Sequence, residues 1–517
     1  MENRLRQALA KGEFALTVEV VAPEGTKDLG EALAPVLRMA RALAGDPRVA
    51  GFSVTDRVRS DEDHDPIRVA LEVAGASGKA PLVHLSGKDR TEADLERAAG
   101  RLGELGLENV LCVTGDRLKA PPADRPVRYL DSVNAIWRLK RLLPWSLVAA
   151  GVSPFKYTEE ALLNQYLKMA KKHLAGADYV VTQVGWDMRK LEELIRYRRA
   201  RGLGQPAVAD LMLLPPGVAR YIHGGAVPGV VVTDDLLRLV RAEAEAPDKG
   251  SGRRLERLAL QLVGVERLGY AGAQLSGLGR AEDVQRVLDL AAEWRDRLPA
   301  LEDWRRAWEA SVRLPGGAPA RLAPDPGYFL FEAGGPGREA PAPPAGARWR
   351  YRALRVLHAG LFHPRSPVHL ALRPLARRVA PGSALDAALG RLERWAKAPA
   401  FGCQACGFCR LPHTLYVCPE TCPKGLANGP CGGSTGNVCE VGDRECVHAA
   451  RYRLAKATGQ LALLEGTLIP AVPEPRGGSS WVSHYAGRDP EIARMPDPRR
   501  SAPGRAPAAG GPGAEAP

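Results

Sequence analysis

Short apolar runs alternate with longer amphipathic stretches over the first 290 or so residues of the chain. The apolar runs, rich in β-branched residues, are ALTVEVV (15–21), VAGFSVT (49–55), APLVHLS (80–86), ENVLCVT (108–114), SLVAAG (146–151), DYVVTQ (178–183), AVADLMLL (207–214) and GAQLSGL (272–278). Between them, apolar residues recur at helical spacing, as in YTEEALLNQYLKMAKKHLAGA (157–177). Continuous apolar strands that alternate with helices indicate parallel βαβ units with both sheet faces covered.

Eight such units match the size of a (β/α)8 barrel. A ninth apolar run, VPGVVV (227–232), leaves a doubly wound sheet open as an alternative. No G-x-G-x-x-G follows any run, which argues against a dinucleotide-binding Rossmann domain. We therefore expect an α/β chain that begins with a TIM-type barrel.

The remainder of the chain divides by composition. Helical spacing covers about 281–311 and 349–398, a Pro/Gly/Ala-rich stretch separates them, and the C-terminal end is again rich in Pro and Gly. The predicted segments are a barrel domain (1–312), a Pro/Gly-rich linker (313–348), a small helical, cysteine-rich domain (349–470) and a disordered tail (471–517).

Charge and hydropathy narrow the function classes. The net charge is +13, mostly from arginines that are spread along the chain and mixed with acids, and basic runs such as RYRALRVLHAGLFHPR also lie in the C-terminal third. Without interleaved aromatics and a concentrated patch, a nucleic-acid binder ranks last. No run of about 20 apolar residues predicts a membrane span, and the N-terminus lacks a signal-peptide pattern. We expect a cytoplasmic protein, where disulfides are rare.

Several polar residues lie at the ends of the predicted strands, where barrels carry their chemistry. Glu19 lies among valines, and an isolated buried carboxylate is costly and has a raised pKa, as a general acid near neutral pH requires. A position facing solvent is the alternative for Glu19. The others are Thr55, His84, Gly115, Asp116 and Gln183, and each alone is compatible with a structural role.

Eight of the nine cysteines lie within the 44 residues from 403 to 446. They are Cys403, Cys406, Cys409, Cys418, Cys422, Cys431, Cys439 and Cys446. The opening C-x2-C-x2-C is typical of iron–sulfur ligands, and four-cysteine zinc is the alternative. Eight thiols suit two four-cysteine sites whose pairing the spacing leaves open, with His413 and His448 as bystanders.

The motifs TVEVVAPEG, GFSVTD, PLVHLSG, VLCVTGD, AAGVSP and LAGADYVVTQ resemble, in order and spacing, those of the methylenetetrahydrofolate reductase family over residues 10–285. This resemblance implies a flavin-containing barrel that reduces 5,10-methylenetetrahydrofolate to 5-methyltetrahydrofolate, a reaction of one-carbon metabolism and methionine biosynthesis. NAD(P)H or a ferredoxin-like protein are the implied electron donors.

The resemblance also implies roles for single residues. It makes Glu19 the general acid and Asp116 a catalytic residue close to flavin and folate. The implied flavin contacts are Thr55, His84, Gly115, Asp116 and Lys172, and the implied folate contacts are Gln183 and Arg280. Departures from the family pattern at Thr114, Gln165 and Lys168 make FMN an alternative to FAD.

The segment CPKGLANGPCGGSTGNVCEV resembles the cysteine-rich C-terminal-type domain associated with these reductases, over residues 350–465. In acetogenic bacteria this domain occurs as a separate partner subunit, and here it is fused. The resemblance implies iron–sulfur clusters of the 4Fe–4S type that carry electrons to or from the flavin. A structural zinc module for partner binding is the alternative, and a redox partner protein and a homo-oligomer stay open.

Overall fold

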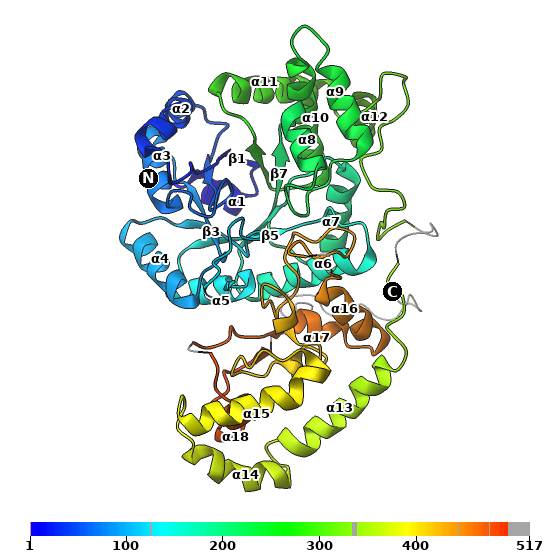
Figure 1. Ribbon diagram of the computed structural model, residues 1–517. Helices are drawn as coiled ribbons and strands as arrows, with labels where there is room; N and C mark the ends of the chain where they lie inside the picture. The colour runs from blue at the N-terminus through cyan, green and yellow to red at the C-terminus, as the bar shows by residue number, and fades with distance from the viewer. Residues whose placement is uncertain (1, 125–126, 333–338, 443, 475, 495–517) are drawn as a thin grey trace, which may run out of the picture.

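The computed structural model describes residues 2–124, 127–332, 339–442, 444–474 and 476–494. Its first part is a closed barrel of eight parallel strands in sequential order (Figure 1). The strands are β1 (Ala15–Val20), β2 (Gly51–Val54), β3 (Leu82–Ser86), β4 (Asn109–Val113), β5 (Leu147–Val152), β6 (Tyr179–Thr182), β7 (Ala207–Met212) and β8 (Gly272–Ser276). The predicted (β/α)8 barrel is confirmed, and the apolar run 227–232 forms no strand.

Helices cover the outside of the barrel because each strand is followed by an amphipathic segment whose apolar side packs on the sheet. These helices are α2 (Leu29–Ala42), α3 (Pro66–Ser77), α4 (Glu92–Glu104), α5 (Ser132–Leu142), α6 (Glu159–Leu174), α7 (Met188–Ala200), α10 (Ser251–Leu268) and α11 (Ala281–Arg297). Further helices are α1 (Arg4–Lys11), α8 (Pro216–His223), α9 (Asp234–Glu243) and α12 (Leu301–Ser311).

The second part of the chain forms a lobe against the α5–α6 side of the barrel (Figure 1). Its helices are α13 (Ala347–Phe362), α14 (Pro367–Arg378), α15 (Ala384–Phe401), α16 (Val447–Ala457), α17 (Leu461–Gly466) and α18 (Ser480–Ala486). Two short 3-10 helices, Leu411–His413 and Pro419–Thr421, interrupt the cysteine-rich segment, and β9 (Thr467–Leu468) pairs with β10 (Ala493–Arg494). No helix in the described part of the chain is long and apolar enough to cross a membrane.

Helix α6 is covered on both sides, unlike an ordinary surface helix of a barrel. One side packs on β5, and α16 and α17 cover the other. As a result Lys168, Lys171 and Lys172 are all buried, although lysines are almost never fully buried unless paired. Helix α6 therefore lies at the interface between the two parts of the chain, and its lysines are buried there.

The predicted linker packs against the barrel where it is described. The backbone oxygen of Tyr328 accepts a hydrogen bond from Lys190 at 2.7 Å, and the ring of Phe329 meets Tyr157 edge-on with centroids 6.1 Å apart. Residues 333–338 of the linker lie outside the described residues. The stretch does not behave as a free spacer, because its few aromatic residues reach a partly apolar surface.

The prediction of a disordered tail from residue 471 is wrong for its first part. Helix α18 lies within it, and Val482 and Tyr485 pack against Ala376 and Val379 of the α14 region. The Pro- and Gly-rich composition of the whole segment concealed a short apolar stretch at residues 480–486. The predicted disorder of residues 495–517 falls outside the described residues.

Asn428 joins the two parts of the chain through a buried amide cluster. Its Nδ2 donates to Asn134 Oδ1 on α5 at 3.0 Å and to the oxygen of Ile469 at 2.8 Å, and its Oδ1 accepts from the Ile469 nitrogen at 2.8 Å. A buried polar group that loses its partner costs about 1–3 kcal/mol. The cluster therefore contributes to holding the lobe on the barrel.

We expect Asn428→Ala to lower the free energy of unfolding by about 2 kcal/mol or more, because it leaves several buried groups unpaired. Urea titration followed by tryptophan fluorescence measures the change. Gln7→Ala, which removes an exposed amide from α1, serves as the control and should shift the midpoint little. Equal stability of the two variants would contradict the assigned role of Asn428.

Candidate functional site

Two carboxyl groups meet at the mouth of the barrel. Gln274 on β8 donates from Nε2 to Glu19 Oε2 on β1 at 3.2 Å and to Asp210 Oδ2 on β7 at 3.0 Å. Ser276 Oγ donates to Asp210 Oδ1 at 2.6 Å. Burial raises the pKa of Glu19 to about 7, and burial together with the Glu19 charge raises that of Asp210. This arrangement favours retention of a proton near neutral pH.

Sequence reasoning identified Glu19 but missed Asp210 and Gln274. The signal for Asp210 was present, because it lies in the apolar run AVADLMLL as Glu19 lies among valines. What the sequence did not show is that strands β1, β7 and β8 are neighbours in a closed barrel, which brings the two acids to a common amide.

His84 and Thr55 lie on neighbouring strands near this mouth. His84 Nε2 is 2.6 Å from Ser53 Oγ, and burial lowers the His84 pKa to about 4, so the ring is neutral at pH 7. Thr55 Oγ1 accepts from the Ala22 nitrogen at 3.2 Å. Both side chains are therefore neutral hydrogen-bonding groups in a buried setting.

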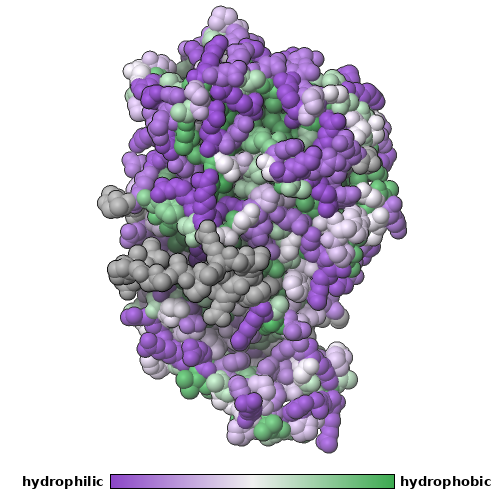
Figure 2. Space-filling model, turned by 180° about the vertical axis from the view of Figure 1, so that it is seen from behind, coloured by the Kyte–Doolittle hydropathy of each residue, from purple (hydrophilic) through white to green (hydrophobic). Residues whose placement is uncertain are grey.

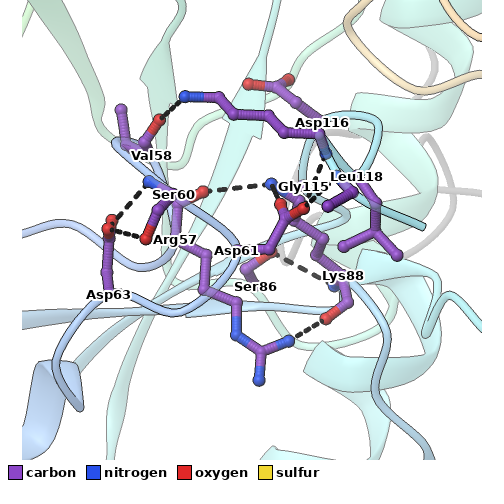
Figure 3. Close-up of polar contacts among 12 residues, drawn as sticks. Arg57, Val58, Ser60, Asp61, Asp63, Ser86, Lys88, Gly115, Asp116 and Leu118 are labelled. Atoms are coloured by element: carbon purple, nitrogen blue, oxygen red, sulfur yellow. Dashed lines mark hydrogen bonds and ion pairs between the residues drawn. The ribbon is translucent and has the colours of Figure 1, made fainter. Parts of the chain in front are cut away.

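A network of ions and turns holds the Gly115–Asp116 loop (Figure 3). Lys88 Nζ pairs with Asp61 at 2.7 Å, and the backbone N–H of Lys88 donates to Ser86 Oγ at 3.2 Å. Gly115 has a φ of +82°, and a Cβ there would lie 2.2 Å from Ser86 Oγ, so the position requires glycine. The carboxylate of Asp116 is exposed and lies clear of this network.

The other residues predicted to contact flavin or folate, Lys172, Gln183 and Arg280, differ in their position and burial. Lys172 Nζ is buried and donates to the oxygen of Gly151 on β5 at 2.5 Å, and burial lowers its pKa to about 7. Gln183 follows β6, and its Oε1 accepts from the Val184 nitrogen at 2.9 Å. Arg280 lies on the surface at the start of α11 in an ion pair with Asp283 at 2.9 Å. Their ligand roles stay predictions.

Two buried polar atoms at the strand ends have no hydrogen-bond partner among the described residues. They are Ser153 Oγ, after β5, and Gln274 Oε1, on β8. Buried polar groups are normally paired, so each unpaired one requires an explanation, for which a bound polar ligand is one physical reason. These atoms, with the acid pair and neutral His84, fit a mouth that holds a polar heterocycle.

The lobe is joined to this mouth through its backbone carbonyls. Three barrel side chains donate to residues 429–434, in the following contacts: Lys168 to Gly429 (3.2 Å) and Pro430 (3.1 Å), Gln165 to Cys431 (2.7 Å), and Lys156 to Gly432 and Ser434 (2.5 Å each). Lys168 also pairs with buried Asp131 at 2.9 Å. The segment 429–434 thus lies against the face of α6 that carries Gln165 and Lys168.

The eight clustered cysteines separate into two groups of four. One hollow is lined by the outer set, Cys403, Cys406, Cys409 and Cys418. Another is lined by the inner set, Cys422, Cys431, Cys439 and Cys446. All eight are free thiols, and burial raises the pKa of Cys418 and Cys422 to about 11. The structure therefore divides the eight thiols between two hollows, and their pairing as metal ligands stays a prediction.

Each set has the number of ligands of a four-thiol metal site. In the described part of the chain, no group of three or more His, Cys, Asp or Glu side chains is arranged to hold a metal ion. Metal binding by either set stays a prediction.

The inner set is next to the barrel mouth. Lys424, two residues after Cys422, donates from Nζ to the oxygen of Gly115 at 2.6 Å and forms a buried ion pair with Glu440. Its amine also lies 4.9 Å from the centre of the Tyr129 ring. One lysine thus connects the inner thiols to the loop that carries Asp116.

Comparison with protein families finds two matches. Residues 4–218 match the family model described as "Methylenetetrahydrofolate reductase", and residues 383–472 match the one described as "Methylene-tetrahydrofolate reductase C terminal". These are the two resemblances inferred from the motifs, and both are confirmed.

The chain has no match among curated proteins. Among solved structures, it aligns with an uncharacterized protein from Clostridium thermocellum that binds two copies of 5-methyl-5,6,7,8-tetrahydrofolic acid. That alignment has a TM-score of 0.44 and 13% identity, and it covers 57% of this chain and 99% of the other.

The two thiol sets predict separable metal sites. We expect Cys431→Ala to remove the metal of the inner set alone and Cys409→Ala that of the outer set alone, so that each variant keeps about half of the bound metal, as two four-cysteine sites require. Anaerobic purification followed by quantification of iron, zinc and sulfide measures this. Cys112→Ala, in β4, is the control and should keep all of the metal. Loss of all metal in both single variants would contradict two independent sites.

Proposed function

Because residues 4–218 match the methylenetetrahydrofolate reductase family and residues 383–472 match its C-terminal domain, we propose that this chain is a flavin-dependent reductase of 5,10-methylenetetrahydrofolate with a fused iron–sulfur module. The observation that carries the proposal is the coupled acid pair, Glu19 and Asp210, in a barrel mouth with unpaired polar groups. The product is 5-methyltetrahydrofolate.

The acid pair supports proton delivery to the folate. Ring opening of the substrate requires a proton on the departing nitrogen, and a carboxyl with a pKa near 7 both holds and releases a proton at neutral pH. Glu19 is partly exposed at the mouth, whereas Asp210 is buried behind it. We therefore assign proton donation to Glu19, which burial keeps protonated near neutral pH, and positioning of the two carboxyl groups to Gln274.

Asp116 is the residue that we assign to electrostatic stabilisation during ring opening. Its carboxylate is exposed at the end of β4, held there by the left-handed Gly115 and by Lys424 on the adjacent carbonyl. A fixed negative charge stabilises a positive charge that develops on the one-carbon unit as the ring opens. Gln183, which can both donate and accept in one plane, fits recognition of a pterin edge.

A flavin would supply hydride transfer at this mouth when bound. Neutral His84 and Thr55 suit contacts to an uncharged ring, and the Ser153 hydroxyl is free to donate or accept. Gln165 and Lys168 are bonded to residues 429–431 of the lobe, so neither is available to a dinucleotide lying along α6. This supports FMN over FAD.

We expect the flavin released by denaturing the purified protein to be FMN, because the lobe covers the side of α6 along which a second nucleotide would extend. Liquid chromatography with mass detection distinguishes FMN from FAD. Stoichiometric FAD would contradict the inferred cover, and a colourless protein that binds no added flavin would contradict the proposed function itself.

The two thiol sets support an electron path within one polypeptide. Cys418 and Cys422 belong to different sets and are four residues apart, so their Cα atoms lie within about 14 Å of one another. The C-x2-C-x2-C start and the four cysteines that line each hollow support iron–sulfur clusters at both. Since Lys424 and Lys156 tie the inner set to the barrel mouth, we place the inner set next to the flavin and the outer set farther along the path.

The acid assignment is tested by Glu19→Gln, which keeps the shape of the side chain and removes its proton. We expect folate turnover to fall by about 100-fold or more, while reduction of the bound flavin by methyl viologen is unchanged. Stopped-flow absorbance separates the two half-reactions. Glu13→Gln, an exposed carboxyl just before β1, is the matched control and should be fully active.

The same assignment fixes a pH dependence. A carboxyl whose pKa is raised to about 7 is protonated below that pH, so kcat/KM for methylenetetrahydrofolate reduction should decrease as the pH rises through 7. A profile that is flat between pH 5.5 and 8.5, or full folate turnover in Glu19→Gln, would remove Glu19 from the acid role.

A further inference from the structure

The helices around the outer thiols present a surface with one sign of charge. Residues 347–401 contain ten arginines and one lysine, but only two acids, Asp386 and Glu393. All ten arginines are exposed, whereas both acids are buried. We call the exposed side chains of residues 347–401 the α13–α15 surface. It carries no exposed carboxylate.

The carboxylates of Asp386 and Glu393 are both hydrogen-bonded inside the lobe. Asp386 accepts from the backbone nitrogens of Gly382 at 3.0 Å and Ser479 at 2.9 Å. Glu393 pairs with Lys397 at 2.5 Å and accepts from Ser479 Oγ at 2.9 Å. Neither carboxylate therefore offsets the positive charge that the surface presents to solvent.

Large apolar side chains lie among these arginines. On α15, Leu385, Leu392 and Trp395 are 57%, 53% and 78% exposed, and Trp349 at the start of α13 is 74% exposed. In Figure 2, the lower lobe shows hydrophobic patches between hydrophilic ones. Exposed tryptophans on a surface rich in arginine are typical of protein-binding sites, where both residue types are enriched.

The surface adjoins the outer thiol set. Lys397 on α15 has its Nζ 3.5 Å from Cys409 Sγ. The guanidinium of Arg350 on α13 lies 5.9 Å from the centre of the Phe401 ring, and Phe401 lines the same hollow as Cys403. A protein docked on α13 and α15 would thus come close to the outer thiols.

We propose that the α13–α15 surface docks an acidic electron-carrier protein of the one-electron iron–sulfur type, which exchanges electrons with the outer thiol set. This inference rests on the proposed function, since it assigns the partner of that electron path. Charge complementarity identifies the partner as acidic, and the adjoining thiols identify it as a redox protein.

Other occupants fit the surface less well. A second copy of this chain would bring the same positive charge and repel. An anionic membrane attracts lysine and arginine equally well. This surface, however, has ten arginines and one lysine. Arginine is the residue that pairs with a carboxylate through two parallel hydrogen bonds. A protein partner therefore agrees best with the composition.

The electrons of the proposed reaction balance with such a carrier. Reduction of one methylenetetrahydrofolate takes two electrons and two protons. The bond from the methylene carbon to the departing nitrogen breaks, that nitrogen gains a proton, and the carbon gains a hydride equivalent. Two reduced one-electron carriers are each oxidised once per turnover. Both protons come from solvent, one through the acid pair to the departing nitrogen and the other as part of the hydride equivalent.

The test compares two reductants of the intact protein. Reduced acidic two-cluster ferredoxin is the docking probe, and reduced methyl viologen is a small donor that needs no docking surface. The variant R391E/R394E reverses two exposed charges on α15, and the control R253E/R286E reverses two on α10 and α11 of the barrel. Trp395→Ala tests the apolar component without a charge change.

We expect R391E/R394E to raise the KM for ferredoxin by about tenfold or more and to weaken its salt dependence, with the viologen-supported rate unchanged. Trp395→Ala should raise the same KM, and the barrel control should leave it unchanged. An unchanged KM in both α15 variants would overturn the proposal. So would anionic phosphatidylglycerol vesicles that bind the wild type but not R391E/R394E, together with an unchanged ferredoxin KM.

Failure of the proposed function gives a different result. If wild-type protein reduces no folate with viologen, the enzyme assignment fails, while ferredoxin binding measured by biolayer interferometry still decides the docking. Binding that is lost in R391E/R394E and kept in R253E/R286E supports the surface. Absence of binding by the wild type at low salt overturns it.

Discussion

The structure depends on the hydrogen bonds that three barrel side chains, Lys156, Gln165 and Lys168, donate to the carbonyls of residues 429–434. A buried amine without an acceptor is costly, and burial lowers the pKa of Lys156 to about 8 even with these partners. The carbonyls of the lobe are in turn withdrawn from water and need donors. The barrel therefore supplies the hydrogen-bond donors and the lobe supplies the acceptors. Separating the two parts would leave both sets of groups without these partners. This mutual dependence explains why α6, a lysine-rich helix, is buried almost throughout.

These hydrogen bonds between barrel and lobe also set the geometry of the chemistry that we propose. It fixes Cys431 of the inner thiol set against α6, and the nearby Lys424 reaches the carbonyl of Gly115. The loop that presents Asp116 is thus held from within the barrel by the Lys88–Asp61 pair and from outside by the lobe. Proton delivery and electron delivery approach the same mouth from different sides, the first from β1, β7 and β8 and the second from the end of β4.

The barrel was predictable because apolar runs with β-branched residues and helical spacing are local properties of the sequence, and the closed barrel confirmed them. The clustering of thiols was visible from spacing alone, and their metal binding stays a prediction. Their division between two hollows needed the fold, since Cys418 and Cys422 are close in sequence and line different hollows. Asp210 was missed because its role depends on strands that become neighbours only in the closed barrel. The burial of Lys171 was missed because it depends on α16 and α17 from the other part of the chain. The prediction of disorder from residue 471 was wrong for α18, because the helix has only seven residues. The Pro- and Gly-rich composition of the longer segment concealed it.

Helix α18 has a practical consequence for the boundaries of the molecule. Ser479 and Trp481 supply donors to Asp386 and Glu393, and Glu393 in turn holds Lys397 beside Cys409. A chain cut near residue 470, where composition alone places the end of the folded part, would leave two buried carboxylates without these donors at the edge of the outer hollow. Helix α18 is thus part of the wall around the outer thiols, although it follows the final cysteine by more than thirty residues.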